Sequence, residues 1–205
     1  MELRPDFKLI VNWIEPGSKV LDLGCGDGTL LAYLQDYRYV RAWGLEIEPD
    51  NIVACIEKGV NVIQTDIDAG LSEFDDDSFD YVVLTETLQA VYYPHRLLKE
   101  MLRVGKHGIV SFPNFGHWRS RFQMGFGGRM PVTPALPNQW YDTPNIHLCT
   151  VKDFEKFCVD LEVNVVERLV LDERHQKRSL IQLMPNLFGT NAMYRMESAN
   201  YKAKL

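Results

Sequence analysis

Residues 19–28 of this 205-residue chain read Lys-Val-Leu-Asp-Leu-Gly-Cys-Gly-Asp-Gly. A short apolar run meets three glycines at every second position, and an apolar segment typical of a helix follows at once. Glycine tolerates tight turns and leaves room for a ligand beside the backbone. The stretch therefore predicts a buried strand that turns sharply into a helix and presents its backbone to a ligand.

A carboxylate in the next expected strand indicates the kind of ligand. Glu46 lies twenty residues after Gly26, a spacing that suits an acid holding ribose hydroxyls. A dinucleotide fingerprint requires Gly-x-Gly-x-x-Gly, but here the third glycine comes one residue early and Thr29 takes its place. Asp22, just before the glycines, would repel a pyrophosphate and suits a ligand with an ammonium group and a sulfonium.

Residues 22–28, Asp-Leu-Gly-Cys-Gly-Asp-Gly, resemble the first motif of class I S-adenosylmethionine-dependent methyltransferases. The resemblance implies that S-adenosylmethionine or S-adenosylhomocysteine binds here, with Asp66 at the adenine amino group and the backbone amide of Ile67 at the ring. An alternative is that Asp66 only opens an acidic surface loop, because residues 66–80 hold seven acids and no Lys or Arg. The candidate cofactor-binding residues are Asp22, Gly24, Cys25, Gly26, Gly28, Glu46, Ile47, Asp66, Ile67 and Thr85.

Alternating apolar strands and helices along the chain predict a doubly wound parallel sheet in one domain spanning residues 1–205. Strands are expected at residues 19–23, 43–47, 61–65, 79–84 and 108–112, and a capped helix from Thr150. Residues 163–171 and 179–184 are expected as two closing strands joined by a charged loop, and the tail 185–205 as loosely packed. The class I fold would place these elements in a mostly parallel seven-stranded sheet with an antiparallel closing strand and helices on both faces.

An insertion at residues 113–149 departs from a minimal fold of this kind. It is expected to be irregular, and it carries a set of aromatics and a net charge of +2 in a chain of −6. It follows the fifth strand, at the end of the sheet where such folds bind ligands. A long connection of this kind predicts a lid, a binding loop or a docking surface, with a rigid structural cover as the alternative.

Three segments of this region are the most specific part of the sequence. They are residues 111–118 (Ser-Phe-Pro-Asn-Phe-Gly-His-Trp), 128–133 (Gly-Arg-Met-Pro-Val-Thr) and 139–147 (Gln-Trp-Tyr-Asp-Thr-Pro-Asn-Ile-His). They closely resemble the MetW family of bacterial methionine biosynthesis, and the resemblance extends from Leu3 to about Asp172. It implies a methyltransferase-like protein that serves alongside a homoserine O-acyltransferase of the α/β-hydrolase type.

Two functions remain open from the sequence: an S-adenosylmethionine-binding accessory or regulatory partner of the acyltransferase, and a methyltransferase acting on a small molecule. The chain lacks the Gly-x-Ser-x-Gly elbow, so it cannot perform serine-based acyl transfer by itself. If it is an enzyme, the candidate catalytic residues are His117, His147, Glu86 and Tyr92. For either histidine, the alternative is a structural hydrogen bond that ties down its own loop.

Net charge, apolar runs and cysteine spacing limit the classes of partner and ligand that are expected. The net charge of −6 disfavours a broad electrostatic grip on nucleic acid. No apolar run approaches membrane length, and the first residues lack an apolar targeting segment. The four cysteines and five histidines form no Cys-x-x-Cys pair and no zinc-like spacing, so no metal is expected. These features together predict a reduced, cytoplasmic protein with no nucleic-acid or membrane partner.

Overall fold

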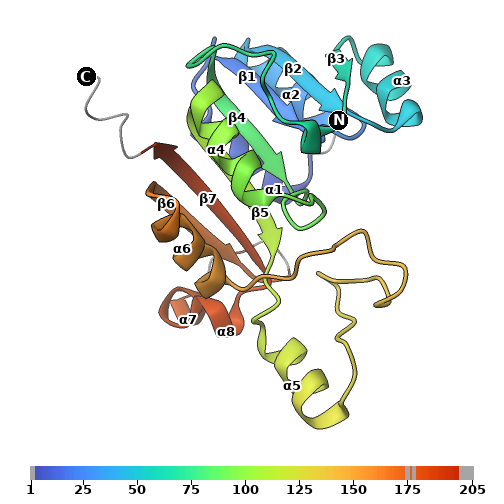
Figure 1. Cartoon of the computed structure of the whole chain (residues 1–205), viewed down its shortest axis with the longest axis vertical. Coiled ribbons are helices and arrows are strands. Elements are labelled where there is room, and N and C mark those ends of the chain that lie inside the picture. Colours follow the sequence, from blue (N-terminus) through green and yellow to red (C-terminus); the bar gives the residue numbers. More distant parts are fainter. Residues whose placement is uncertain (1–2, 174–175, 177–178, 199–205) are drawn as a thin grey trace.

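One seven-stranded sheet organises the computed structural model, which describes residues 3–173, 176 and 179–198. The strand order is β3-β2-β1-β4-β5-β7-β6 (Figure 1). The pairs from β3 through β5 are parallel, whereas β7 runs antiparallel to both of its neighbours, β5 and β6. The prediction of a mostly parallel seven-stranded sheet with an antiparallel closing strand is therefore confirmed.

The first half of the chain follows the expected alternation. Its strands are β1 (Lys19–Leu23), β2 (Arg41–Glu46), β3 (Asn61–Gln64), β4 (Phe79–Thr85) and β5 (Gly105–Pro113). The helices that connect them are α2 (Thr29–Arg38), α3 (Pro49–Glu57), the short 3-10 turn η1 (Ile67–Ala69) and α4 (Pro94–Val104). A further helix, α1 (Pro5–Trp13), precedes β1 and was not predicted.

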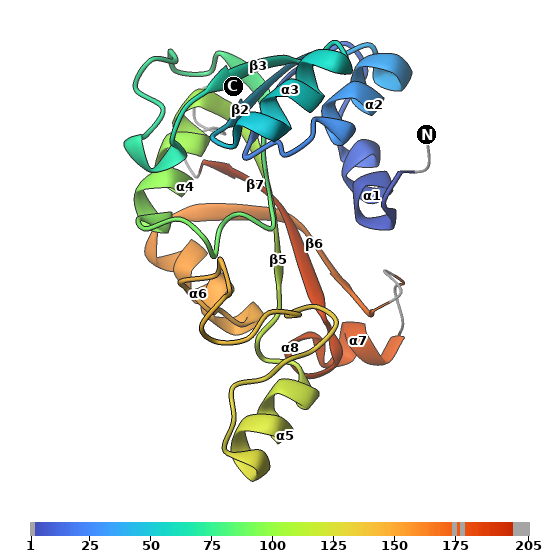
Figure 2. The same cartoon turned by 90° about the vertical axis from the view of Figure 1, so that its right-hand side faces the viewer.

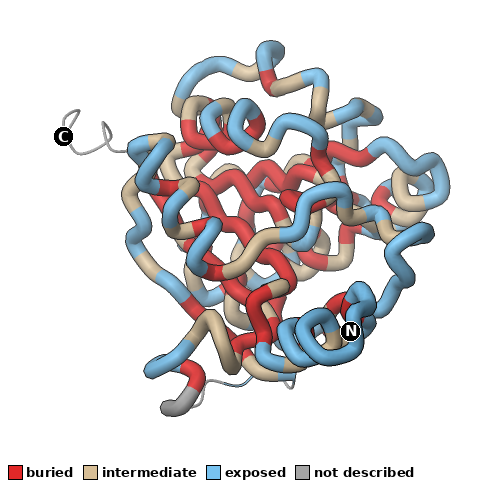
Figure 3. Tube along the Cα trace, turned by 60° about the horizontal axis from the view of Figure 1, so that its bottom comes forward, coloured by how far each residue is buried: buried red, intermediate tan, exposed pale blue. Residues whose placement is uncertain are grey.

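The sheet is covered on both faces, and Figure 3 shows the buried residues concentrated in its strands. Neighbouring residues of β1 enter different cores: Val20 packs with α1, α2 and α3, and Leu21 packs with α4 and α6 (Val151–Asp160). This separation follows from the alternation of side chains along a strand. It explains why Val20, Leu21 and Leu23 of β1 and the run Tyr81–Leu84 of β4 are apolar on both faces of the sheet. Figure 2 shows the two layers of helices.

Helix α6 begins where the sequence predicted. The Thr150 hydroxyl accepts from the backbone N–H of Asp153 at 3.2 Å, and the Asp153 carboxylate accepts from the N–H of Thr150 at 3.0 Å. This reciprocal pair satisfies two N–H groups that a helix start would otherwise leave unpaired.

The closing strands differ from the prediction. β6 (Val163–Leu171) is as expected, but Ser179–Leu183 forms helix α7, and Pro185–Phe188 forms helix α8. The second closing strand is β7 (Asn191–Ser198), which lies within the segment expected to be loosely packed. That expectation is wrong for residues 191–198. Much of the expected charged loop 172–178, and residues 199–205, lie outside the described residues.

The two charged residues of β7 explain the error, because each finds a partner on β6. Arg195 pairs with Glu167 of β6 at 3.5 Å, and Glu197 accepts from the Asn164 side chain at 2.7 Å. Tyr194 and Met196, which flank Arg195 in the strand, are fully buried. The charges of Arg195 and Glu197 made the segment look like exposed surface, although both side chains are paired with residues of β6 beside a buried core.

The insertion is not wholly irregular. It contains helix α5 (Trp118–Gly127), which ends at Gly128 in the left-handed conformation. The N–H of Gly128 donates to the carbonyl of Met124 at 3.2 Å, and the N–H of Arg129 donates to that of Gln123 at 3.5 Å. Both views show α5 projecting from the body at one end of the long axis, with α3 near the other end (Figures 1 and 2). In the described part of the chain, no helix combines the length and apolarity needed to cross a bilayer.

Candidate functional site

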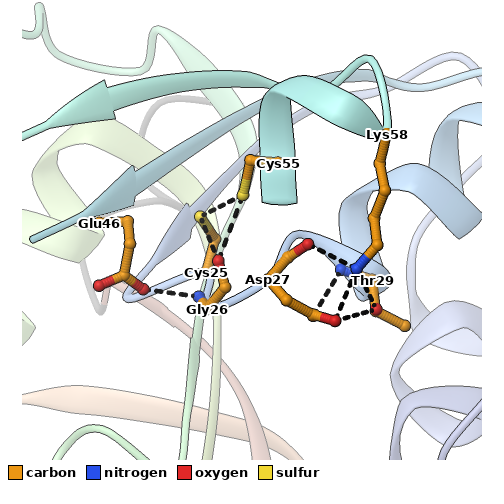
Figure 4. A network of polar contacts seen from close by, with 7 residues as sticks. All are labelled: Cys25, Gly26, Asp27, Thr29, Glu46, Cys55 and Lys58. Atoms are coloured by element: carbon orange, nitrogen blue, oxygen red, sulfur yellow. Dashed lines mark hydrogen bonds and ion pairs between the residues drawn. The ribbon is translucent and has the colours of Figure 1, made fainter. Parts of the chain in front are cut away.

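The turn after β1 is held against the end of β2 by the backbone. The N–H groups of Gly24 and Cys25 both donate to the carbonyl of Leu45, at 2.8 and 3.0 Å. The N–H of Gly26 donates to Glu46 Oε2 at 2.8 Å (Figure 4). The structure thus brings the predicted glycines and the predicted acid into direct contact, at the carboxyl ends of adjacent parallel strands.

The three glycines of this turn have different roles. All three have positive φ angles, which glycine adopts without strain. A Cβ at Gly28 would lie 2.8 Å from Cys55 Sγ, and one at Gly24 would lie 3.0 Å from Thr87 Oγ1. A Cβ at Gly26 would meet nothing within 4 Å. Gly24 and Gly28 therefore allow the chain to pack, while Gly26 faces open space beside its own backbone.

Glu46 is buried and already has three hydrogen-bond donors. Besides Gly26, the N–H groups of Ile47 and Glu48 donate to Oε1, at 2.8 and 3.0 Å. A carboxylate offers about four acceptor positions, so roughly one remains for a ligand. A grip on two ribose hydroxyls would require at least one of these backbone donors to be exchanged for a hydroxyl.

Asp22 is buried in the same region, and its Oδ1 has no hydrogen-bond partner among the described residues. Burial, with a smaller contribution from the charge of Glu46, raises the pKa of Asp22 to about 7. A buried carboxylate without a partner is costly unless a cation or donor satisfies it. The arrangement fits a ligand that brings a positive group to Oδ1.

We expect Asp22→Asn to stabilise the ligand-free protein above pH 7. Because the pKa of Asp22 is higher in the folded state than in the unfolded chain, the folded state loses stability as pH rises from about 4 to about 7. The neutral amide removes that loss. The free energy of unfolding of the variant should therefore exceed that of the wild type at pH 8 but not at pH 4. Urea unfolding across this pH range measures the difference.

The matched control is Asp36→Asn, at an exposed position of α2, which should leave the pH profile unchanged. A lower stability of Asp22→Asn at pH 8 would contradict the interpretation of Asp22 as a destabilising buried charge.

Helix α3 holds the turn from the other side, through residues that sequence reasoning missed. Lys58 Nζ donates to the carbonyl and the carboxylate of Asp27, at 2.7 and 2.6 Å, and to Thr29 Oγ1 at 2.9 Å. The Cys55 thiol donates to the carbonyl of Gly26 at 3.2 Å and lies 3.7 Å from Cys25 Sγ (Figure 4). Burial raises the pKa of both thiols, so they act as protonated packing groups rather than nucleophiles.

The loops after β3 and β4 are joined through a second acid. Asp66 is exposed and accepts from the N–H of Asp68 at 2.9 Å, at the start of η1, where Ile67 is half-buried. Asp68 in turn accepts from the N–H groups of Tyr92 and Tyr93, at 2.9 and 3.3 Å. Asp66 therefore lies at the strand end where the sequence predicted it, in a loop fixed by its neighbour.

The returning part of the insertion joins the same loops. The N–H groups of Ile146 and His147 both donate to the carbonyl of Gln89 at 2.9 Å. His147 Nε2 lies 3.3 Å from the carbonyl oxygen of Tyr92. The structure thus brings Tyr92 and His147 together, and the histidine contact is of the kind that ties a loop to the backbone.

The other two catalytic candidates have different surroundings. Glu86, just after Thr85 at the end of β4, forms an ion pair with Arg4 at 3.2 Å. His117 is buried at the start of α5 and borders a cavity that Asp172 and Thr190 also line. Burial, aided by the nearby positive charge of Arg119, lowers the pKa of His117. Among the described residues, no group of three or more His, Cys, Asp or Glu side chains is arranged to hold a metal ion.

Comparison with known proteins identifies the relatives of this arrangement. The family model described as methionine biosynthesis protein MetW matches residues 4–196. The chain belongs to the MetW family. One relative, the bifunctional methionine biosynthesis protein MetXA/MetW of Rhodopirellula baltica, is 38% identical over 207 residues. The match covers 97% of this chain but 33% of that protein, so the MetW-family chain spans about a third of its relative's length.

Two further comparisons concern methyltransferases. The ubiquinone biosynthesis O-methyltransferase of Pseudomonas fluorescens is 33% identical over 145 residues, covering 65% of this chain and 62% of that protein. A solved S-adenosylmethionine-dependent methyltransferase from Mesorhizobium loti superposes with a TM-score of 0.69 at 14% identity, covering 94% of this chain and 97% of that one. The MetW-family chain therefore has the class I methyltransferase fold, as the first motif predicted.

Proposed function

We propose that this chain binds S-adenosylmethionine at the turn after β1 and acts in methionine biosynthesis as an accessory or regulatory partner of a homoserine O-acyltransferase of the α/β-hydrolase type. The observation that carries the partner role is the relative from Rhodopirellula baltica, whose name joins MetXA and MetW in one bifunctional chain. Two functions carried by one polypeptide in a relative are a sound reason to look for an association of the separate proteins.

The ligand proposal rests on the chemistry of the residues around the turn. Asp22 would face the ammonium group, the backbone at Gly26 would approach the ligand closely, and Glu46 would take a ribose hydroxyl. Ile47, which is 52% exposed beside Glu46, offers an apolar surface for the adenine ring, with Asp66 and the amide of Ile67 for its polar edge. Bound S-adenosylmethionine would supply either a transferable methyl group or a signal of methionine supply.

A second function, methylation of a small molecule, is favoured by the likeness to the ubiquinone biosynthesis O-methyltransferase. Tyr92 and His147 meet beside the loop that carries Asp66. A methyl transfer of this kind needs little more than positioning and one base. His147 is the best placed of the four candidates to serve as that base.

An acylation assay separates the two functions. The homoserine O-acyltransferase of the same organism is assayed with homoserine and its acyl donor, with and without this chain and with S-adenosylmethionine present or absent. We expect O-acylhomoserine formation to rise with added chain until it saturates. An unchanged rate, together with failure of the two proteins to co-purify, would refute the partner role. S-adenosylhomocysteine accumulating with a methylated product would favour the enzyme.

We expect Glu46→Ala to lower the affinity for S-adenosylmethionine at least about tenfold. The substitution removes a charge-assisted acceptor for the ribose, and each such bond contributes roughly 1.5–3 kcal/mol. It also frees the N–H of Gly26, which Glu46 holds at 2.8 Å. Calorimetric titration with S-adenosylmethionine and S-adenosylhomocysteine measures the loss.

Glu46→Gln is the matched control, since it keeps one acceptor oxygen and should give an intermediate affinity. Unchanged affinity in folded Glu46→Ala would remove Glu46 from the site.

A further inference from the structure

The arm, defined here as residues 118–141, exposes large side chains to an unusual degree. It consists of α5 and the segment that follows it, and it projects from the body (Figures 1 and 2). Phe126 is 84% exposed, Trp140 and Tyr141 are each 71% exposed, and Phe122 is 59% exposed. Ser120 is the one residue of α5 that is buried. Apolar side chains gathered in this way on a surface mark an interaction site.

The arm is held in shape despite its exposure. The Gln123 side chain bonds both backbone groups of Val132, accepting from its N–H at 2.9 Å and donating to its carbonyl at 3.1 Å. Thr133 and Leu136 exchange two backbone hydrogen bonds, at 2.9 and 3.0 Å. Between α5 and the returning chain lies a hollow of about 800 Å³, lined in part by Phe122, Arg129, Met130 and Trp140. Because the hollow is already formed, a partner that binds there does not have to meet the entropic cost of ordering this segment.

The composition of the arm is that of a protein interface. It holds three Arg and no Lys, Asp or Glu, giving +3 in a chain whose net charge is −6. Interface cores are enriched in Trp, Tyr, Phe, Met and Arg and depleted in Lys, Glu and Asp. Arg119 is paired with Glu173, and Arg121 donates to the carbonyl of Gly116. Arg129 is exposed on the rim of the hollow, where it can meet a carboxylate of the partner.

We propose that the arm is the docking surface for the homoserine O-acyltransferase, and that it receives an acidic patch with an apolar centre on that enzyme. This inference rests on the proposed function, and it deepens it by naming the surface. Helix α5 of the arm and helix α3, which packs against the turn after β1, lie toward opposite ends of the long axis (Figure 2). A partner bound around α5 would therefore leave the proposed ligand site open, and ligand and partner can bind at the same time.

The test compares acyltransferase affinities of the full chain and of two arm variants. Trp140→Ala removes an exposed ring at the hollow, and Arg129→Glu reverses the charge on its rim. Each should weaken binding at least about tenfold, as central aromatic and Arg positions do. The controls are Tyr37→Ala, an exposed aromatic of α2 that stacks on Tyr33, and Lys99→Glu, an exposed charge reversal on α4. Both controls should bind as the wild type does.

Each outcome decides one point. Loss of binding in the arm variants alone, with thermal stability and S-adenosylhomocysteine affinity unchanged, supports the arm. Equal affinities in folded variants and wild type would overturn the arm as the docking surface and leave the partnership standing. No binding by the wild type would refute the partnership itself and, with it, this surface. A wild-type dimer that Trp140→Ala dissociates, with acyltransferase binding unchanged, would assign the arm to self-association and overturn the proposal.

Discussion

Gly26→Val should abolish detectable binding of S-adenosylmethionine and S-adenosylhomocysteine. The φ angle of Gly26 is +54°, and a Cβ there would point into open space rather than into the protein. A branched side chain at this position fills the space that the proposed ligand must occupy to approach the backbone. Calorimetric titration of the folded variant is the measurement.

The control separates the blocked site from backbone strain. Gly17, which precedes β1, also has a positive φ of +78°, and a Cβ at this position would meet nothing within 4 Å. Gly17→Val therefore carries a similar conformational cost at the opposite end of β1 from the glycine turn, and it should lower stability while retaining ligand affinity. Binding by Gly26→Val with wild-type affinity would refute the ligand site, and loss of binding in both variants would trace the effect to strain.

Tyr194→Ala should destabilise the protein by about 3–5 kcal/mol, the range for removing a large buried aromatic side chain. Tyr194 is fully buried in β7 and packs between Phe112 and Phe154, with ring centroids 5.9 and 4.6 Å away. The loss is a large part of the total stability of a typical domain. Urea unfolding, monitored by circular dichroism, measures this loss of stability.

Tyr194→Phe keeps the ring and removes only the hydroxyl, which lies 3.4 Å from Glu155 Oε1. We expect it to cost about 0.5–1.5 kcal/mol, the usual net contribution of a hydrogen bond. If Tyr194→Ala changed the free energy of unfolding by less than about 0.5 kcal/mol, as substitutions at ordinary surface positions do, the result would instead support the expectation of a loosely packed tail.

The parts that sequence reasoning predicted well are those specified by neighbouring residues. The turn at Gly24–Gly28 and the reciprocal cap at Thr150 and Asp153 each depend on a few consecutive positions. The nearness of Glu46 to the glycine turn follows because parallel neighbouring strands bring their carboxyl ends to one edge of the sheet. The hydrogen bond between the Gly26 N–H and Glu46 was not predicted. The fold class followed from the alternation of these local units.

The parts that were missed depend on partners far along the chain. β7 looks polar until Glu167 and Asn164 of β6 are placed beside it. Gly28 needs to be glycine because Cys55 packs on it, and no local pattern marks that contact. Helix α5 was missed because its glycines and aromatics have weak helix propensity, and its end is fixed by the left-handed Gly128.

The position of β7 also constrains the order in which the chain can fold. β6 pairs with the sheet through β7, and β7 is the later of the two in the sequence. While the chain is being synthesised, β5 therefore remains an open edge and β6 has no neighbour until residues 191–198 leave the ribosome. Open edges recruit strands from other chains. We expect the nascent protein to be most prone to aggregation in this interval. Insertion of β7 then pairs the edge of β5 and one side of β6 in one step, and β6 becomes the outer strand of the sheet.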